Sequence, residues 1–201
     1  MIMRRSLLAA ALLLSAGAAV PATAALDAGA FIANLGNEAL AVLGPQTSPE
    51  QRAVAFRALF RRDFDVPQIA RFVLGPYWRV ATPEQQREFM RLFENYIALA
   101  YSTRLSQFSG ERLLVTGWQP IPGGAIVSSE ARRPGGGPPI RIDWRLTRYD
   151  GTYKINDVVV DGVSMAITER SEFASVIQRT GGNVQGLIAM LRAKTAGAAG
   201  D

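Results

Sequence analysis

The first half of the chain has apolar residues spaced three and four positions apart, which is the repeat of an amphipathic α-helix. A first helix is predicted from Leu26 to Leu43, with Asp27 as its N-cap and a Gly-Pro pair at its end. Ser48-Pro49-Glu50-Gln51 has the pattern of a capping box, with proline in the first turn, and predicts the start of a second helix. A short third helix is predicted from Val66 to Leu74.

The longest predicted helix opens at Thr82-Pro83-Glu84-Gln85, which repeats the start signal of the second helix, and reaches about Phe108. Its apolar face is wider than a helix resting on a sheet requires. Ordinary core packing is the commoner explanation of such a face. The residues that form it are Phe89, Leu92, Phe93, Tyr96, Ile97, Leu99, Ala100 and Leu105.

From Glu111 onward the apolar repeat changes to every second residue, which is typical of β-strands. The chain therefore has an α+β pattern, in which helices precede and follow a four-stranded antiparallel meander. Two further helices are predicted, from about Thr168 to Thr180 and from Asn183 to Lys194, and the start of the first could also lie at Ser164. The predicted strands are Arg112 to Gln119, Ala125 to Arg132, Ile140 to Tyr149 and Thr152 to Val160.

The N-terminus has the features of a cleaved secretory signal. Arg4 and Arg5 precede an apolar run from Ser6 to Val20, and the small residues of Ala22-Thr23-Ala24 predict cleavage before Ala25. A membrane anchor is the alternative, but this run is shorter than the ~20 residues that span a bilayer. We therefore expect residues 1–24 to be removed and residues 25–201 to form a single domain.

Composition narrows the chemistry that this domain can carry out. Without Arg4 and Arg5, the 22 Lys and Arg residues become 20 against 17 Asp and Glu, a net charge of +3. This balance permits weak attraction to anionic lipid head groups but does not indicate a nucleic-acid partner. Cysteine and histidine are both absent, which excludes disulfides, Cys/His zinc sites, and catalytic triads that use histidine.

Candidate catalytic groups in the sheet have a simpler explanation. Acidic and basic residues alternate on its polar face, and opposite charges commonly pair across strands. Ser164 follows the Asp161-Gly162 break in the chain and is predicted to be a local cap or turn residue rather than a catalytic nucleophile, because no histidine exists to activate it. The charged residues of the polar face are Glu130, Arg132, Arg141, Asp143, Arg145 and Asp157.

Three longer motifs resemble one family. They are Leu74-Gly75-Pro76-Tyr77-Trp78-Arg79 with the following Thr82-Pro83-Glu84-Gln85 and Glu88-Phe89, then Val160-Asp161-Gly162-Val163-Ser164-Met165, and then Gly186-Leu187-Ile188 with Leu191-Arg192. Together with Tyr96 and Tyr101, they resemble the MlaC family of periplasmic phospholipid-binding proteins, also called the toluene-tolerance family. The likeness runs in order from about Phe31 to Arg192.

This resemblance implies a function as well as a fold. The sheet and helices would enclose an apolar cavity that holds the acyl chains of a phospholipid, so the phospholipid is cargo and no cofactor is expected. The protein would be a periplasmic monomer and not an enzyme. It would carry lipid between an outer-membrane lipoprotein complex and an inner-membrane ABC transporter complex with a lipid-binding ring protein. A hopanoid-associated branch of the family stays open as an alternative.

The expected cavity lining combines residues of the motifs with apolar residues of the long helix and the sheet. Arg79 and Arg104 are weaker candidates for contact with a phosphate at the mouth, since an ordinary exposed helix charge is the better explanation of each. The candidate lining residues are Val73, Leu74, Tyr77, Trp78, Phe93, Tyr96, Ile97, Tyr101, Trp144, Val159, Val163 and Met165.

Two other classes of function remain as alternatives. The first is an enzyme that acts on a lipid in the same cavity, with Asp143 or Asp161 as the base. The second is an interaction module whose sheet is a scaffold for partner proteins. A filled interior without room for one acyl chain would favour the second alternative.

Overall fold

The computed structural model describes residues 27–42, 44, 46–105, 111–149 and 151–196, and within these ranges the chain forms seven helices and one five-stranded sheet. The signal segment, Leu26, Leu43 and Phe108 lie outside them. The helices are α1 (Ala28–Val42), α2 (Pro49–Asp63), α3 (Val66–Leu74), α4 (Tyr77–Val80), α5 (Pro83–Leu105), α6 (Met165–Arg179) and α7 (Val184–Thr195). The strands are β1 (Arg112–Ile121), β2 (Gly124–Arg132), β3 (Ile140–Tyr149), β4 (Thr152–Val160) and β5 (Val163–Ser164).

Capping boxes begin α2 and α5 as predicted. The Ser48 hydroxyl accepts the backbone N–H of Gln51 at 3.2 Å, and the Gln51 side chain accepts the N–H of Ser48 at 3.1 Å. Thr82 and Gln85 repeat this exchange at 3.2 and 3.0 Å. Each box satisfies two N–H groups that the first turn of a helix would otherwise leave without partners.

The connection between α3 and α5 differs from the prediction. No helix was predicted between Leu74 and Thr82, but Tyr77–Val80 forms the short helix α4. Gly75 ends α3 with a φ of +58°, which only glycine adopts readily, and its N–H bonds the carbonyls of Arg71 and Phe72. The chain reverses there, and Pro76 then precedes the single turn of α4.

The sheet is antiparallel throughout, with strand order β1-β2-β3-β4-β5, so the prediction of four strands was wrong. Asp161 and Gly162 have φ values of +47° and +84°, as in the two-residue turn that joins tight hairpins. This turn folds Val163 and Ser164 back to pair with Val160 and Val159. The fifth strand is only two residues long, too short to show an alternating pattern.

Helix α6 begins at Met165, close to the earlier of the two starts considered. Ser164 is its N-cap and accepts the Ile167 N–H at 3.1 Å. The Asp157 carboxylate of β4 accepts the Ser164 hydroxyl at 2.7 Å and the Ala166 N–H at 3.1 Å. The cap predicted for Ser164 is thus confirmed, and the sheet carboxylate fixes the start of α6.

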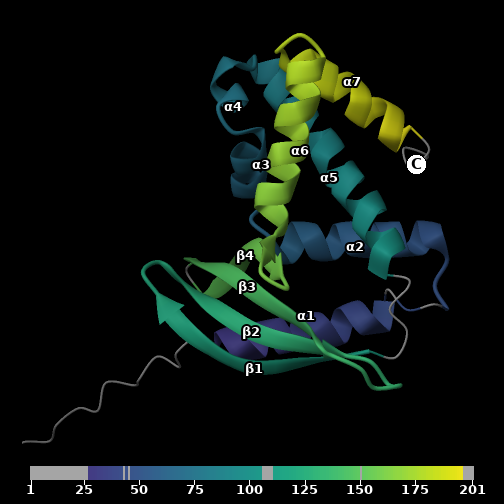
Figure 1. Ribbon diagram of the computed structural model, residues 1–201, viewed down its shortest axis with the longest axis vertical. Helices are drawn as coiled ribbons and strands as arrows, with labels where there is room; N and C mark the ends of the chain where they lie inside the picture. Colours follow the sequence, from purple (N-terminus) through teal and green to yellow (C-terminus); the bar gives the residue numbers. More distant parts are fainter. Residues whose placement is uncertain (1–26, 43, 45, 106–110, 150, 197–201) are drawn as a thin grey trace, which may run out of the picture.

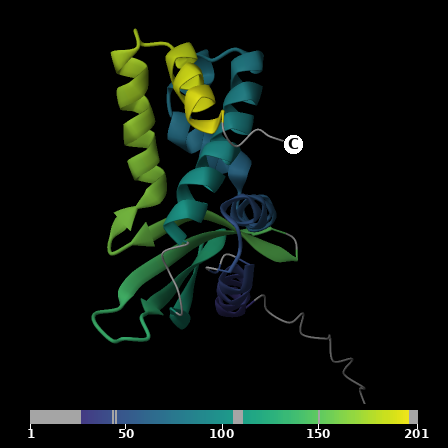
Figure 2. The ribbon, with the colours of Figure 1, turned by 90° about the vertical axis from the view of Figure 1, so that its right-hand side faces the viewer.

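The helices and the sheet have separate apolar cores. One core joins the buried faces of α3, α5, α6 and α7, and the other joins α1 and the inner face of β2, β3 and β4. Helix α2 belongs to both, since Phe60 lies in the first core and Leu59 in the second, and Phe56 and Phe64 pack against each. Figures 1 and 2 show the two parts, with the sheet and α1 at one end and α3 to α7 at the other.

Long-range contacts close the helical part. The Arg192 side chain of α7 pairs with Glu88 of α5 at 2.6 Å, across 104 positions of sequence.

No helix of the described ranges is both long enough and apolar enough to cross a membrane. The enclosed cavity implied by the family resemblance is not shown in the described part of the chain.

Candidate functional site

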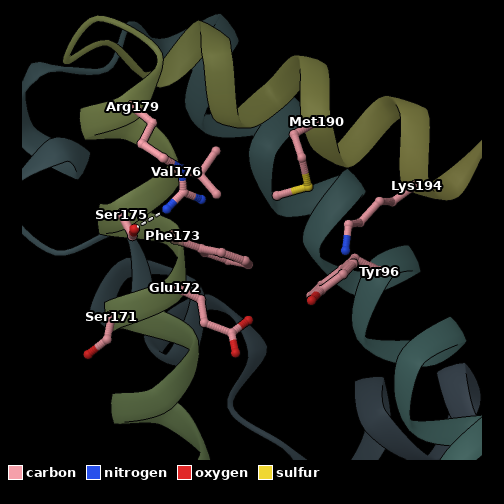
Figure 3. Close-up of a pocket in the computed structure, with 9 residues that line it drawn as sticks. All are labelled: Tyr96, Ser171, Glu172, Phe173, Ser175, Val176, Arg179, Met190 and Lys194. Atoms are coloured by element: carbon pink, nitrogen blue, oxygen red, sulfur yellow. Dashed lines mark hydrogen bonds between the residues drawn. The ribbon is translucent and has the colours of Figure 1, made fainter.

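An open cleft lies between α5, α6 and α7 and has a volume of about 560 Å³. This is within the range of about 300–1,000 Å³ typical of ligand pockets. Figure 3 shows that side chains from all three helices point into it. Its lining residues are Tyr96, Ser171, Glu172, Phe173, Ser175, Val176, Arg179, Met190 and Lys194.

Helical spacing places these side chains on one surface. Phe173 and Val176 are three residues apart on α6, and Met190 and Lys194 are four apart on α7, so each pair lies on one face of its helix. Tyr96 completes the cleft from the broad apolar face of α5. The cleft therefore exists only where these three helices meet.

The floor of the cleft is aromatic and continuous with the helical core. Phe173 is 1% exposed, and its ring lies 5.9 Å from that of Phe89, 6.2 Å from that of Phe93 and 5.9 Å from that of Tyr96. The rings of Phe89 and Phe93 meet it edge to face, which is a favoured geometry for aromatic pairs. An apolar ligand on this floor would contact the core directly.

Positive charges stand at the edge of the same cleft. The Lys194 ammonium lies 5.7 Å from the centre of the Tyr96 ring, within range of a cation–π contact. Arg179 donates a hydrogen bond to the Ser175 hydroxyl. Glu172 is the acidic residue of the lining. The arrangement of apolar floor and cationic edge suits an amphipathic anion better than a purely polar ligand.

A buried carboxyl lies one turn before Phe173 on α6. Glu169 is 8% exposed; one of its oxygens accepts the Tyr101 hydroxyl at 3.4 Å, and the other is buried without a hydrogen-bond partner. Burial, and next the nearby charge of Glu172, raises the pKa of Glu169. Burial, reinforced by Glu169, raises the pKa of Tyr101 to about 12.

Comparison with known proteins identifies the family. The family model described as "MlaC protein" matches residues 35–193. The chain belongs to the MlaC family. The matched range includes α5, α6 and all of α7 except its last two residues, so of the residues that line the cleft Lys194 lies just beyond it.

Two known proteins are similar to this MlaC chain, one in sequence and one in structure. A curated toluene tolerance protein, ttg2D of Pseudomonas putida, is 24% identical over 108 residues, which cover 54% of this chain and 50% of that protein. This chain thus matches about half the length of that relative. A solved phospholipid-binding protein from Ralstonia solanacearum, in complex with a phospholipid, is 22% identical with a TM-score of 0.72. The match covers 87% of this chain and 99% of that one, and it shows a shared fold.

The structure brings together most of the lining residues expected from the MlaC resemblance. Eight of them lie in or against the helical core, and of these Tyr96 also lines the cleft. Phe93 touches the floor from below through the Phe173 ring. Their roles in binding stay predictions. The eight are Val73, Leu74, Tyr77, Trp78, Phe93, Tyr96, Ile97 and Tyr101.

The other four expected lining residues lie elsewhere. Trp144 packs against the sheet core and donates to the Ser129 hydroxyl at 2.9 Å. Val159 is opposite Asp143 in the register, whereas its neighbour Val158 is opposite Trp144 and packs against that core. Val163 is 54% exposed on β5. Met165 is partly buried at the start of α6 and belongs to neither core.

Sequence reasoning missed most of the cleft. Phe173, Val176 and Met190 lie on predicted helices, but their spacing equally fits the buried face of a helix in a filled core. Arg179 and Lys194 resemble ordinary charges in the last turn of a helix. A signal was present in the apolar face of α5, which is wider than a helix resting on a sheet requires.

The arginine candidates for the mouth are separated. The Arg104 guanidinium lies 5.2 Å from the centre of the Tyr101 ring, near the buried Glu169, but it does not line the cleft. Arg79 lies on α4 and lines a shallower depression between α3, α4 and α6. The phosphate contact considered for each stays a prediction.

The candidate general bases have structural partners. Asp143 accepts the Ser128 hydroxyl at 2.6 Å on the outer face of the sheet. Asp161 accepts the Arg141 backbone N–H at 3.0 Å within the β4–β5 turn. Across the strands, Arg145 and Asp157 pair at 3.9 Å. In the described part of the chain, no three acidic side chains gather into a group that could hold a metal ion.

Proposed function

We propose that this protein is a non-enzymatic phospholipid carrier of the periplasm. The observation that carries the proposal is the cleft between α5, α6 and α7, which joins an aromatic floor to a cationic edge. Acyl chains would lie on the floor formed by Tyr96 and Phe173, and a phosphate would lie near Lys194. Membership of the MlaC family and the fold shared with a phospholipid-binding protein support the same assignment.

The energetics require more burial than the open cleft provides. Covering an acyl chain of about sixteen carbons is worth roughly 12 kcal/mol, at ~0.8 kcal/mol per CH₂. A carrier must offer nearly as much apolar contact as the membrane, or the lipid would not leave the bilayer. We therefore propose that α6 and α7 move away from α5 during loading, and that acyl chains enter the helical core.

The Glu169–Tyr101 contact marks where this opening would begin. Its 3.4 Å hydrogen bond is long, and the second carboxyl oxygen of Glu169 has no partner. Burying an unsatisfied carboxyl oxygen costs free energy, so separation of α5 from α6 at this point costs less than it does at the packed Phe89, Phe93 and Phe173 rings. The enclosed cavity expected for the family would be the loaded state.

The proposed cellular role follows from the family. The protein would be exported by its N-terminal signal and would carry phospholipid between an outer-membrane lipoprotein complex and an inner-membrane ABC transporter complex with a lipid-binding ring protein. It would release the lipid chemically unchanged, because the two candidate bases, Asp143 and Asp161, are hydrogen-bonded within the sheet and its turn. Binding through shape and apolar area permits the cargo to be released.

Lipid extraction from purified protein, followed by mass spectrometry, tests the function. We expect unaltered phospholipid in roughly stoichiometric amount. A hopanoid in place of phospholipid would assign the protein to the hopanoid-associated branch. Protein that is empty, and that converts an added lipid to product, would disprove the carrier and support the cavity enzyme.

Tyr96→Asp tests the position of the site. A carboxylate on the aromatic floor must be desolvated when an acyl chain covers it, so we expect retained phospholipid to fall about tenfold or more. The matched control is Val54→Asp, which places the same charge on an exposed valine of α2. Equal lipid content in the two folded variants would exclude Tyr96 from the site.

A further inference from the structure

A second surface combines arginines with exposed apolar side chains. It is formed by the end of α3, by α4 and by the middle of α6, on a shallow depression that Gly75 and Pro76 also line. We call it the α3–α4 patch and define it by Arg71, Phe72, Trp78, Arg79, Val80 and Arg170.

The three arginines of the α3–α4 patch have no acidic partners in the described structure, and two of them lie over aromatic rings. The Arg71 guanidinium lies 5.5 Å from the centre of the Trp78 ring, and that of Arg170 lies 5.1 Å from the centre of the Phe72 ring. Within the described residues, neither these two nor Arg79 forms an ion pair with a carboxylate. Their charges are therefore not neutralised within the described structure.

The nearby acidic residues are turned elsewhere. Glu169 is buried against Tyr101, Glu172 lines the cleft on another face of α6, and Glu84 pairs with Arg87 at 2.9 Å. The α3–α4 patch is thus a region of positive potential on a chain whose excess of positive charge is small.

Apolar side chains are exposed among these charges. Phe72 is 40% exposed and Val80 is 75% exposed. Ile167, three residues before Arg170 on α6 and hence on the same side of that helix, is 54% exposed. If this surface contacted only solvent, polar residues would be expected at these positions.

Helix α4, which carries Trp78, Arg79 and Val80 of the α3–α4 patch, lies away from the sheet. Figure 1 shows it at the upper left of the helical part. Gly75 fixes this geometry, because a Cβ at that position would lie 3.1 Å from the Arg170 Nε.

We propose that the α3–α4 patch docks the protein reversibly on the surface of an anionic bilayer. Arginines near such a surface interact with lipid phosphates, and Trp, Phe and Val side chains enter the boundary between head groups and acyl chains. An acidic protein would satisfy the charges, but it would leave Phe72 and Val80 without an apolar environment. The proposal does not depend on what the cleft carries.

Vesicle flotation tests this docking with the full mature chain. The probes are vesicles of phosphatidylcholine alone and vesicles that also contain phosphatidylglycerol. The variant combines Arg71→Gln, Arg79→Gln and Arg170→Gln. The matched control combines Arg112→Gln, Arg141→Gln and Arg148→Gln, which remove three exposed arginines of the sheet that also lack ion pairs in the described structure.

We expect wild-type protein and the control to float with the anionic vesicles and not with phosphatidylcholine alone. Each basic residue near an anionic surface changes partitioning roughly fivefold, so the patch variant should bind roughly 100-fold more weakly. Raising the salt from about 0.1 to about 1 M shortens the screening length from about 10 to about 3 Å and should release the wild-type protein. Val80→Asn should weaken binding at about 0.1 M salt, because it removes an exposed apolar side chain of the patch.

Three results would overturn the proposal. The first is no flotation of wild-type protein with anionic vesicles, which would favour an acidic protein as the partner. The second is equal loss of binding in the patch variant and the control, which would show that only net charge matters. The third is loss of copurified phospholipid from the patch variant together with its vesicle binding, which would make the α3–α4 patch part of the cargo site.

Discussion

Gly75 is the residue that most directly shapes the α3–α4 patch. Its φ of +58° suits glycine alone, and the space around its Cα is occupied by the Arg170 guanidinium. The same glycine thus ends α3, turns the chain into α4 and holds an arginine of the α3–α4 patch.

Gly75→Ala should destabilise the fold. The added methyl group forces either a strained backbone or displacement of Arg170, and such strain costs about 1–3 kcal/mol. Urea denaturation should show the fall in the free energy of unfolding. Gly117→Ala is the control, because no atom lies within 4 Å of a Cβ there, and its stability should change little. Equal stability of the two variants would contradict the role given to Gly75.

Glu169 predicts a dependence of stability on pH. Burial raises the pKa of Glu169 in the folded protein above 4.5, its ordinary value. The folded state therefore binds the proton more tightly than the unfolded state, and its stability falls as the pH rises from 4.5 through the raised pKa. Glu169→Gln cannot lose a proton, so its stability relative to wild-type protein should increase over that interval and then stay constant.

Denaturation at a series of pH values measures this difference, and Glu50→Gln is the control of opposite sign. Hydrogen bonds from its own backbone N–H, and next from Ser48, lower the pKa of Glu50. Its removal should therefore reduce stability above pH 4.5. A difference between Glu169→Gln and wild-type protein that does not change with pH would show that folding does not raise the pKa of Glu169.

At the scale of elements, the junction of β4, β5 and α6 connects the sheet to the helical part. Asp157 accepts hydrogen bonds from both the Ser164 side chain and the Ala166 backbone. The N-terminus of α6 is favourable for a carboxylate, because the helix dipole is positive there. Asp157 of β4 therefore holds the first turn of α6 against the sheet.

Ser164→Ala should lower the free energy of unfolding by about 1–2 kcal/mol, since it removes an N-cap. It also leaves the Asp157 carboxylate without its 2.7 Å donor, so the loss should be at the upper end of values for caps. Ser171→Ala is the control on the same helix. Its hydroxyl only bonds the Ile167 carbonyl one turn before, and thermal denaturation should show a much smaller change.

Local signals explain which elements could be predicted from the sequence. The starts of α2 and α5 depend on residues three positions apart, so the chain itself identifies them. Strand β5 and helix α4 are too short for periodicity, and each forms because a turn with positive φ directs the chain back toward an existing surface. Their existence depends on tertiary contacts that no window of sequence contains.

For the whole molecule, the apolar pattern identified the α+β order of elements but not the cleft. Phe173 and Met190 satisfy the same pattern whether a helix covers them or a ligand does. Likewise, the expectation for Val159 took no account of the β3–β4 register, which sets that residue opposite Asp143. A binding site formed by several elements can be predicted only when the distances between those elements are known.

The pairing of α7 with α5 also determines when the cleft can form. The meander joins strands that are neighbours in sequence, whereas Arg192 and Glu88 lie 104 positions apart. Contacts between distant positions carry a larger entropic cost of loop closure, so they form late in folding. We expect the sheet to assemble first and the cleft last. Cargo would then be accepted only by a chain whose last helix has docked, so possession of a lipid would report that folding is complete.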